Sequence, residues 1–272
     1  MNRASAWCIP VGSFGLALAL SILIGPSTRA QGMRAPAQET GCPCKVTVTC
    51  KVNACRYEFD PATLPGATEK DLKDIVDAAV AHCKTDAEFA ACFNGFNENN
   101  VKSVLGQVLK QIQQGKRKAY TLVTNGVAKV SSKCVNPTGN GGDVTLDLCG
   151  VAITLIPKGA PKSLNDHENG HVKIQNHYVC VLLRKLLEVR LTQEICSKKY
   201  KDQKELERDA QNLAGKIQRE FIAAMGTLND WEEKYDTDTD DGENGQDQDQ
   251  EAIKITNAMD ALAKQKFPGV FE

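Results

Sequence analysis

The chain has 272 residues, a formal net charge of −1 and eleven cysteines, and 42% of its residues are hydrophobic. A chain of this size can bury one substantial core with a small appended region. It has no arginine-rich or aromatic-interleaved stripe, which argues against a nucleic-acid binder. Its acidic residues are concentrated in residues 230–251, which hold eleven of them and one lysine.

The first 30 residues have the pattern of a secretory signal peptide. Arg3 gives a basic start, residues 11–25 form an apolar run, and residues 27–30 offer a small-residue cleavage site. The run is shorter than the about 20 residues that a transmembrane helix needs, so an uncleaved anchor is the lesser alternative. We therefore expect a secreted or periplasmic protein with no stable membrane anchor after cleavage, and a disordered leader over residues 31–41.

Loss of Cys8 with the signal peptide leaves ten cysteines, and an even number in an exported chain predicts up to five disulfides. Cys83 and Cys92 flank a predicted turn and can join two short helices. Cys180 and Cys196 are expected on one helix about 24 Å apart, too far to pair with each other. A structural zinc cluster is the alternative for four of the cysteines: Cys42, Cys44, Cys50 and Cys55.

Residues 42–117 are expected to form a cysteine-rich, mainly helical region. Alternating valines predict a hairpin over residues 42–58. Thr68 is the expected N-cap of a helix. Apolar residues at helical spacing predict two more helices, one through Phe89 and one over residues 100–114.

The hydrophobic period changes to that of strands after Lys118. The pair Asn125-Gly126 lies between two strand-like runs and predicts a hairpin with a two-residue turn. Two further strands are expected over residues 144–148 and 151–156, on either side of Gly150. Together these strands predict a small antiparallel sheet.

An HExxH motif at residues 167–171 is the most informative feature of the chain. His167 and His171 are four residues apart on an expected helix, so both imidazoles can reach one metal ion. Glu168 lies about 100° further round, where a carboxylate can deprotonate a metal-bound water. A catalytic zinc normally takes three protein ligands, so a third is needed. The alternative is an amphipathic helix whose histidines only bond to their neighbours.

Two long helices of nearly equal length are expected after the motif, over residues 172–196 and 203–228. Each covers about 38 Å at about 1.5 Å per residue, so an antiparallel helical hairpin returns the chain to the motif. The oxygen-rich segment 230–242 arrives there and is expected to supply the third ligand. The predicted fold is α+β: a small antiparallel sheet packed on the HExxH helix, then a long antiparallel helical hairpin, after a disulfide-rich helical N-terminal region.

These residues resemble a family of predicted secreted zinc-dependent proteases, which pair HExxH with a downstream YDxxTxHG motif. Here the downstream motif reads Tyr235-Asp236-Thr237-Asp238-Thr239-Asp240-Asp241-Gly242. The resemblance covers roughly residues 118–250, and Asp241 stands where the family has histidine. Aspartate is an acceptable zinc ligand. The resemblance implies a zincin-like domain over residues 118–272 that holds one Zn²⁺ through His167, His171 and Asp241.

The same resemblance implies hydrolysis of peptide bonds in a peptide or protein substrate. Glu168 is expected to take a proton from the zinc-bound water and to pass it to the leaving amine. Tyr235 either hydrogen-bonds a developing oxyanion or packs. The alternative function is a non-catalytic exported metal-binding or structural protein derived from the same fold.

Two further alternatives concern the metal ligands. His177 has the spacing of the metzincin motif HExxHxxGxxH, but Ile174 replaces the glycine that ends the helix in that motif. In a continuing helix His177 lies about 240° round from His171 and cannot share its ion. The acidic segment 236–251 is either a solvated loop or a Ca²⁺ site. Its EF-hand-like candidates are Asp240, Asn244, Gly245 and Glu251.

Overall fold

The computed structural model describes residues 42–239 and 247–272, which belong to one compact unit. The expected signal peptide at residues 1–30 and the expected leader at residues 31–41 lie outside the described residues. Within the described part of the chain, no helix is long and apolar enough to cross a membrane.

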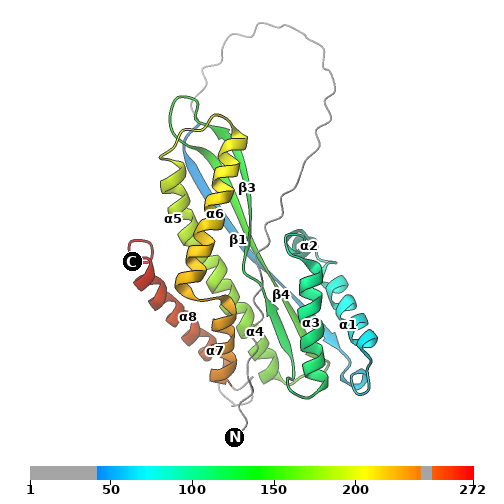
Figure 1. Ribbon diagram of the computed structural model, residues 1–272. Coiled ribbons are helices and arrows are strands. Elements are labelled where there is room, and N and C mark those ends of the chain that lie inside the picture. The colour runs from blue at the N-terminus through cyan, green and yellow to red at the C-terminus, as the bar shows by residue number, and fades with distance from the viewer. Residues whose placement is uncertain (1–41, 240–246) are drawn as a thin grey trace, which may run out of the picture. The chain divides into compact units, whose positions relative to one another are not determined.

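The protein combines helices with a four-stranded sheet, so the predicted α+β class is confirmed (Figure 1). In chain order the elements are β1 (Lys45–Phe59), the 3₁₀ helix η1 (Pro61–Thr63), α1 (Glu69–Cys83), α2 (Ala87–Phe93), α3 (Glu98–Gln113), β2 (Tyr120–Val123), β3 (Val127–Val135), β4 (Gly142–Pro157), α4 (Lys162–Asn176), the π-helical segment η2 (His177–Leu183), α5 (Arg184–Ile195), α6 (Gln203–Met225), α7 (Leu228–Thr239) and α8 (Gln248–Lys266). The expected cap of α1 is present, because the Thr68 side chain accepts a hydrogen bond from the backbone N–H of Asp71.

The sheet is mixed, so the prediction of an antiparallel sheet is wrong. Strand β1 runs parallel to β4 over its whole length, from Lys45 opposite Asp143 to Phe59 opposite Pro157. The hairpin expected over residues 42–58 is absent, because those residues form one continuous strand that pairs with β4. A parallel neighbour requires a long crossover connection, and the segment from α1 to β3 provides it.

The two strands predicted around Gly150 are a single long strand, β4, and β2 and β3 both pair with it antiparallel. The predicted hairpin at Asn125-Gly126 is therefore also wrong, because β2 and β3 follow one another along the same edge of β4. Gly126 is required there for space rather than for a turn: a Cβ on it would lie 2.7 Å from the side chains of Leu148 and Val179.

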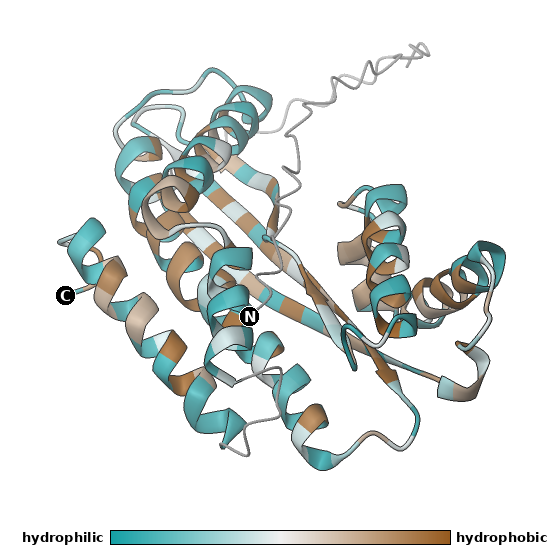
Figure 2. Cartoon of the chain, turned by 60° about the horizontal axis from the view of Figure 1, so that its bottom comes forward, coloured by the Kyte–Doolittle hydropathy of each residue, from teal (hydrophilic) through white to brown (hydrophobic). Residues whose placement is uncertain are grey.

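Side chains of β4 alternate between two hydrophobic clusters, one on each face of the sheet. Val144, Leu146 and Leu148 pack with α4 to α8, whereas Val151 and Ile153 pack with α1 to α3. Figure 1 shows these two groups of helices on opposite sides of the strands, and Figure 2 shows the brown hydrophobic segments of the strands between them. The second half of β4 is consequently buried on both faces.

Among helices α4 to α8, the segment from α4 to α5 and helix α6 form a long helical hairpin. Helix α4 continues through η2 into α5 without a break, and α6 then packs against α5. The chain leaves α6 through Gly226, whose φ of 80° favours glycine, and enters α7 beside α4. The C-terminal helix α8, which we did not predict, packs against both α4 and α7.

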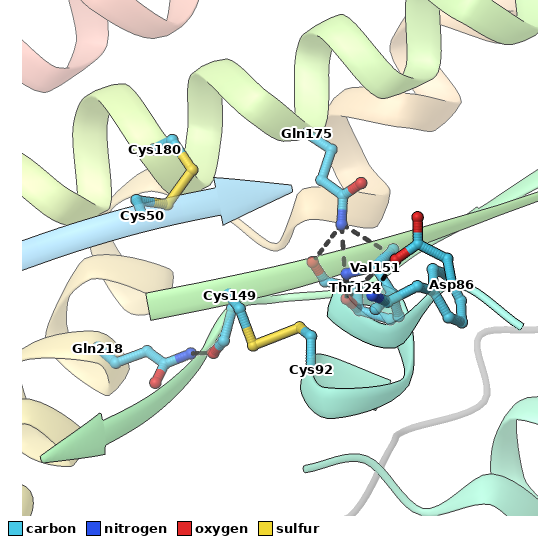
Figure 3. The surroundings of a disulfide bond; sticks show 11 residues. Cys50, Asp86, Cys92, Thr124, Cys149, Val151, Gln175, Cys180 and Gln218 are labelled. Atoms are coloured by element: carbon cyan, nitrogen blue, oxygen red, sulfur yellow. Dashed lines mark hydrogen bonds between the residues drawn. A yellow bond between two sulfur atoms is a disulfide. The ribbon is translucent and has the colours of Figure 1, made fainter. Parts of the chain in front are cut away.

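Five disulfides join the ten described cysteines, as the even count predicts. The pairs are Cys42–Cys134, Cys44–Cys196, Cys50–Cys180, Cys55–Cys83 and Cys92–Cys149. The suggested Cys83–Cys92 bond is wrong, because Cys83 faces β1 and Cys92 faces β4. The exclusion of a Cys180–Cys196 bond is confirmed. Figure 3 shows the bonds that fasten η2 to β1 and α2 to β4.

Gln175 fixes α4 over the sheet close to these disulfides (Figure 3). Its fully buried amide donates to the carbonyls of Thr124 at 2.8 Å and Val151 at 3.0 Å. The missing side chain of Gly150 leaves room for this amide, because a Cβ there would lie 3.0 Å from the Gln175 nitrogen. The position of α4, which carries the HExxH motif, is thus fixed relative to β4.

Candidate metal centre

Helices α4 and α7 bring together three side chains that can bind one metal ion. His167 and His171 come from α4, and Asp236 comes from α7. Both histidines are buried. The Nε2 atoms of the two imidazoles are 3.2 Å apart, and Asp236 Oδ1 lies 3.3 Å from that of His167 and 3.0 Å from that of His171.

These separations match one face of a zinc coordination tetrahedron. With bonds of about 2.0–2.1 Å, ligand atoms around a tetrahedral zinc lie about 3.3 Å apart. Around a zinc ion, these three protein atoms would leave a fourth position for water or substrate, as catalytic rather than structural zinc sites do.

The hydrogen bonding of His171 leaves the lone pair of Nε2 facing this centre. Its Nδ1 is in close contact with a carboxylate oxygen of Glu232, one helical turn before Asp236 on α7. A carboxylate can only accept, so Nδ1 carries the proton and donates it. A carboxylate that orients the far nitrogen of a histidine ligand is a common feature of zinc sites.

His167 is oriented in the same sense by neutral partners. Its Nδ1 lies 3.1 Å from Thr239 Oγ1 and 3.3 Å from Gln248 Oε1. The Thr239 hydroxyl donates its own proton to the carbonyl of Tyr235 at 2.7 Å, so towards His167 it accepts. Nδ1 of His167 is therefore also a donor, and its Nε2 presents a lone pair.

Three lone pairs converge at this point, which requires a positive charge between them. Asp236 Oδ1 is buried and receives no hydrogen bond. Burial opposes ionisation of Asp236, but the two imidazoles outweigh it and lower the pKa of this carboxyl. Burial would likewise lower the pKa of His171, yet Glu232 and Asp236 raise it. A proton can supply the charge in the metal-free protein, and a divalent cation fits the same donor set.

Glu168 lies beside the triad and is held by the sheet. It is buried, and its Oε2 accepts a hydrogen bond of 2.6 Å from Thr121 Oγ1 of β2. Because the Thr121 hydroxyl donates its proton to Glu168, it accepts the hydrogen bond of 2.8 Å from the Thr154 hydroxyl. Burial raises the pKa of Glu168, while His171 and Thr121 act in the opposite direction. A carboxylate with a raised pKa suits proton transfer near neutral pH.

A small pocket opens onto these residues, with a cavity volume of about 10 Å³, which is room for about one water molecule. Tyr120 and Arg117 line it together with the triad and Glu168. The Arg117 guanidinium lies 5.3 Å from the centre of the Tyr120 ring, and its Nη1 is 3.7 Å from Asp236 Oδ2. Burial raises the pKa of Tyr120 to about 12, so its hydroxyl stays protonated and can donate.

Tyr235 is fully buried and is not among the residues that line the pocket. Its ring stacks on His167 with centroids 4.9 Å apart, and its hydroxyl donates to the carbonyl of Gln248 at 3.3 Å. Gly170 makes this packing possible, because a Cβ there would lie 2.0 Å from the Tyr235 hydroxyl. The close approach at Gly170 is thus made by the Tyr235 side chain of α7.

Asp241, the expected third ligand, lies outside the described residues. The carboxylate beside the two imidazoles belongs to Asp236, because α7 extends to Thr239 where a loop was expected. The helix continues through His177 as expected, and Nε2 of His177 lies 2.8 Å from Asp260 Oδ1.

The Ca²⁺ candidates are only partly described. Asp240, Asn244 and Gly245 lie outside the described residues. Glu251 lies in α8 and forms an ion pair of 2.5 Å with Lys254.

Tyr235 was a candidate from the sequence, but four other residues of this site were given no role: Glu232, Asp236, Thr239 and Gln248. Glu232, Tyr235, Asp236 and Thr239 follow each other at helical spacing, which is a pattern of one buried face. The high acidic content of residues 230–251 concealed that face, because most of the acids that the structure describes there are exposed. Gln248, at the start of the unpredicted helix α8, gave no sequence signal.

Comparison with protein-family models, with curated proteins and with solved structures finds no match to this chain.

Proposed function

We propose that this protein is an exported zinc-dependent hydrolase, most simply a metallopeptidase. The observation that carries the proposal is the triangle of Nε2 and Oδ1 atoms formed by His167, His171 and Asp236, with the buried carboxylate of Glu168 beside it. Such a site offers three ligands, an open position and a general base. The five disulfides support export to an oxidising compartment.

The resemblance to the predicted secreted zinc-dependent proteases supports the choice of a peptide substrate. Three residues that match the downstream motif contact the HExxH residues: Tyr235 stacks on His167, Asp236 reaches both imidazoles, and Thr239 bonds to His167 Nδ1. In this proposal Asp236 is the third ligand, and Asp241, in the place of the family's histidine, is not required.

When bound, the zinc ion lowers the pKa of a water molecule and polarises the scissile carbonyl. Glu168 takes the proton from the attacking water and transfers it to the leaving amine. Thr121 holds the carboxylate in place through its hydrogen bond. The hydroxyl of Tyr120 and the guanidinium of Arg117 face the same pocket, so they are the groups available to stabilise negative charge on the carbonyl oxygen. We therefore assign this role to them rather than to Tyr235.

Metal analysis of the purified protein tests the proposal. We expect one zinc per chain, lost in Asp236→Ala and retained in Asp241→Ala. Glu168→Gln should keep the zinc and lose hydrolysis of a denatured-protein substrate by at least about 10³-fold. Retention of zinc in Asp236→Ala with loss in Asp241→Ala would restore Asp241 as the ligand. Absence of zinc from the wild type would instead support a non-catalytic exported protein, in which a proton on His171 replaces the metal.

A further inference from the structure

A second, larger pocket lies next to the metal centre. It has a cavity volume of about 340 Å³. Its walls come from the end of β1, from η1, from the last turn of α3, from the end of β4 and from the first turn of α4. The side chains that line it are mostly apolar, and among them are Phe59, Leu64, Ile112 and Leu164.

This apolar pocket adjoins the pocket at the metal centre, because Leu164 and Lys118 line both. Leu164 precedes His167 by three residues and Glu168 by four on α4, so each of these two side chains lies about 5–6 Å from that of Leu164. A molecule with its reacting carbonyl beside Glu168 therefore has the apolar pocket within the reach of its next group.

The pocket is preformed. The amide of Gln113 donates to the carbonyls of Leu64 and Ala67, both at 2.9 Å, and ties the loop after η1 to α3. Four of the lining residues are prolines: Pro61, Pro65, Pro157 and Pro161. Proline has no backbone N–H, so the wall presents few donors that an apolar occupant would leave without a hydrogen bond. Preformed apolar pockets with few polar groups are typical small-ligand sites.

We propose that the apolar pocket binds a large apolar side chain of the peptide substrate, on a residue next to the cleaved bond. This inference rests on the proposed function and adds the substrate class: peptides with leucine, isoleucine, phenylalanine or methionine at that position. It also gives α3 and the loop before α1 a role in the activity, because they build one wall of the pocket.

The first test is cleavage of a mixed peptide library by the zinc-loaded protein, with mass-spectrometric reading of the cut sites. We expect large apolar residues to be favoured about tenfold over alanine at one fixed position beside the cut. Ile112→Asp, and Pro65→Glu at the exposed rim, should remove this preference and keep the zinc content. Ile253→Asp is the control, because it adds the same charge at an exposed apolar residue of α8. Cleavage without an apolar preference overturns the inference while leaving the hydrolase proposal intact.

The second test does not depend on activity. Methyl NMR spectra of the Glu168→Gln protein are recorded with two blocked peptides, acetyl-Ala-Gly-Leu-Ala-amide and its counterpart with serine in place of leucine. We expect the methyl signals of Leu64, Ile112 and Leu164 to shift with the leucyl peptide, and to shift at least about tenfold less at equal concentration with the seryl peptide. Equal responses, or none, overturn the inference. Selective shifts in a protein that binds no zinc would support binding of an apolar side chain in the pocket and would contradict the proposal of a zinc-dependent hydrolase.

Discussion

Helix α4 offers the site two imidazoles and a carboxylate within five residues, whereas α7 offers one candidate ligand and the side chains that orient the others. The α4 residues follow from their spacing alone, since positions four apart on a helix face the same way. The α7 residues depend on how two helices distant in sequence meet. The comparison predicts that changes to the HExxH side chains of α4 abolish hydrolysis, whereas changes on α7, apart from Asp236, alter the zinc affinity and the stability of the fold.

Removal of an α4 ligand should have the largest effect. In His171→Ala we expect loss of zinc and of hydrolysis. Zinc at a hundredfold excess over its Kd should stabilise the wild type by about 2.7 kcal/mol and leave the variant unchanged. Without metal, the free energy of unfolding of the variant should be about 3 kcal/mol lower than that of the wild type, because Glu232 stays buried without its partner. Urea unfolding with and without zinc measures both values. His177→Ala is the control and should keep its zinc; its loss of zinc would revive the metzincin alternative.

Neutralising the α7 carboxylate that supports His171 should have a smaller effect. Glu232→Gln keeps an acceptor for Nδ1 but removes the charge, so zinc affinity should fall about 10–100-fold. Glu232 also raises the pKa of His171, which strengthens competition by protons in the wild type. The difference in zinc affinity between the wild type and Glu232→Gln should therefore become smaller as the pH falls. Competition with a zinc chelator at several pH values measures it, with the exposed neighbour Glu233→Gln as control. An unchanged affinity would remove Glu232 from the site.

The contact between the two helices can be tested at Gly170. Gly170→Ala places a Cβ against the ring of Tyr235, so we expect a loss of about 1–3 kcal/mol in the free energy of unfolding. Gly106→Ala in α3 is the matched control, because it meets open space and should gain up to about 1 kcal/mol from helix propensity. A gain in both variants would show that α4 and α7 are further apart than described.

The smallest effect should come from the strand residue that holds the general base. The hydrogen bond from Thr121 lowers the pKa of Glu168, so Thr121→Val should raise that pKa further. Activity requires the ionised carboxylate and is lost as the pH falls through its pKa. The acid limb of the kcat/KM profile should therefore move to higher pH, by about one pH unit. Thr154→Val, one hydrogen bond further away, should move it less. A shift to lower pH would contradict the assignment of Glu168 as the base.

The sequence was sufficient for the features that depend on local spacing. It gave the α+β class, the cap at Thr68, the number of disulfides and the side-by-side placement of His167, Glu168 and His171. It could not give the parallel pairing of β1 with β4, because Lys45 and its partner Asp143 have no local signal that relates them. Asn125-Gly126 led to the wrong prediction of a hairpin turn, because glycine is selected both by tight turns and by closely packed positions. The sequence alone does not distinguish these two causes.

The third ligand shows the same limit within the candidate site. The expected helical hairpin led to the segment that contains Asp236, the carboxylate that lies beside the two imidazoles, but did not distinguish it from Asp241. Whether Asp236 or Asp241 faces the histidines depends on where α7 ends and how it is rotated. Both are set by the contacts of Tyr235 and Thr239 with α4, which the spacing along one helix does not contain.

The parallel pairing of β1 has a consequence for the order in which the protein can fold. This strand is made early, yet its only strand neighbour, among the described residues, follows about a hundred residues later. Three cysteines in β1 or just before it form disulfides with distant partners. The pairs are Cys42–Cys134, Cys44–Cys196 and Cys50–Cys180. A growing chain must therefore keep β1 unpaired, and must keep the thiols of Cys42, Cys44 and Cys50 reduced or provisionally bonded. Correct oxidation of the N-terminal cysteines is thus a late step, which follows synthesis of nearly the whole sheet and of α5.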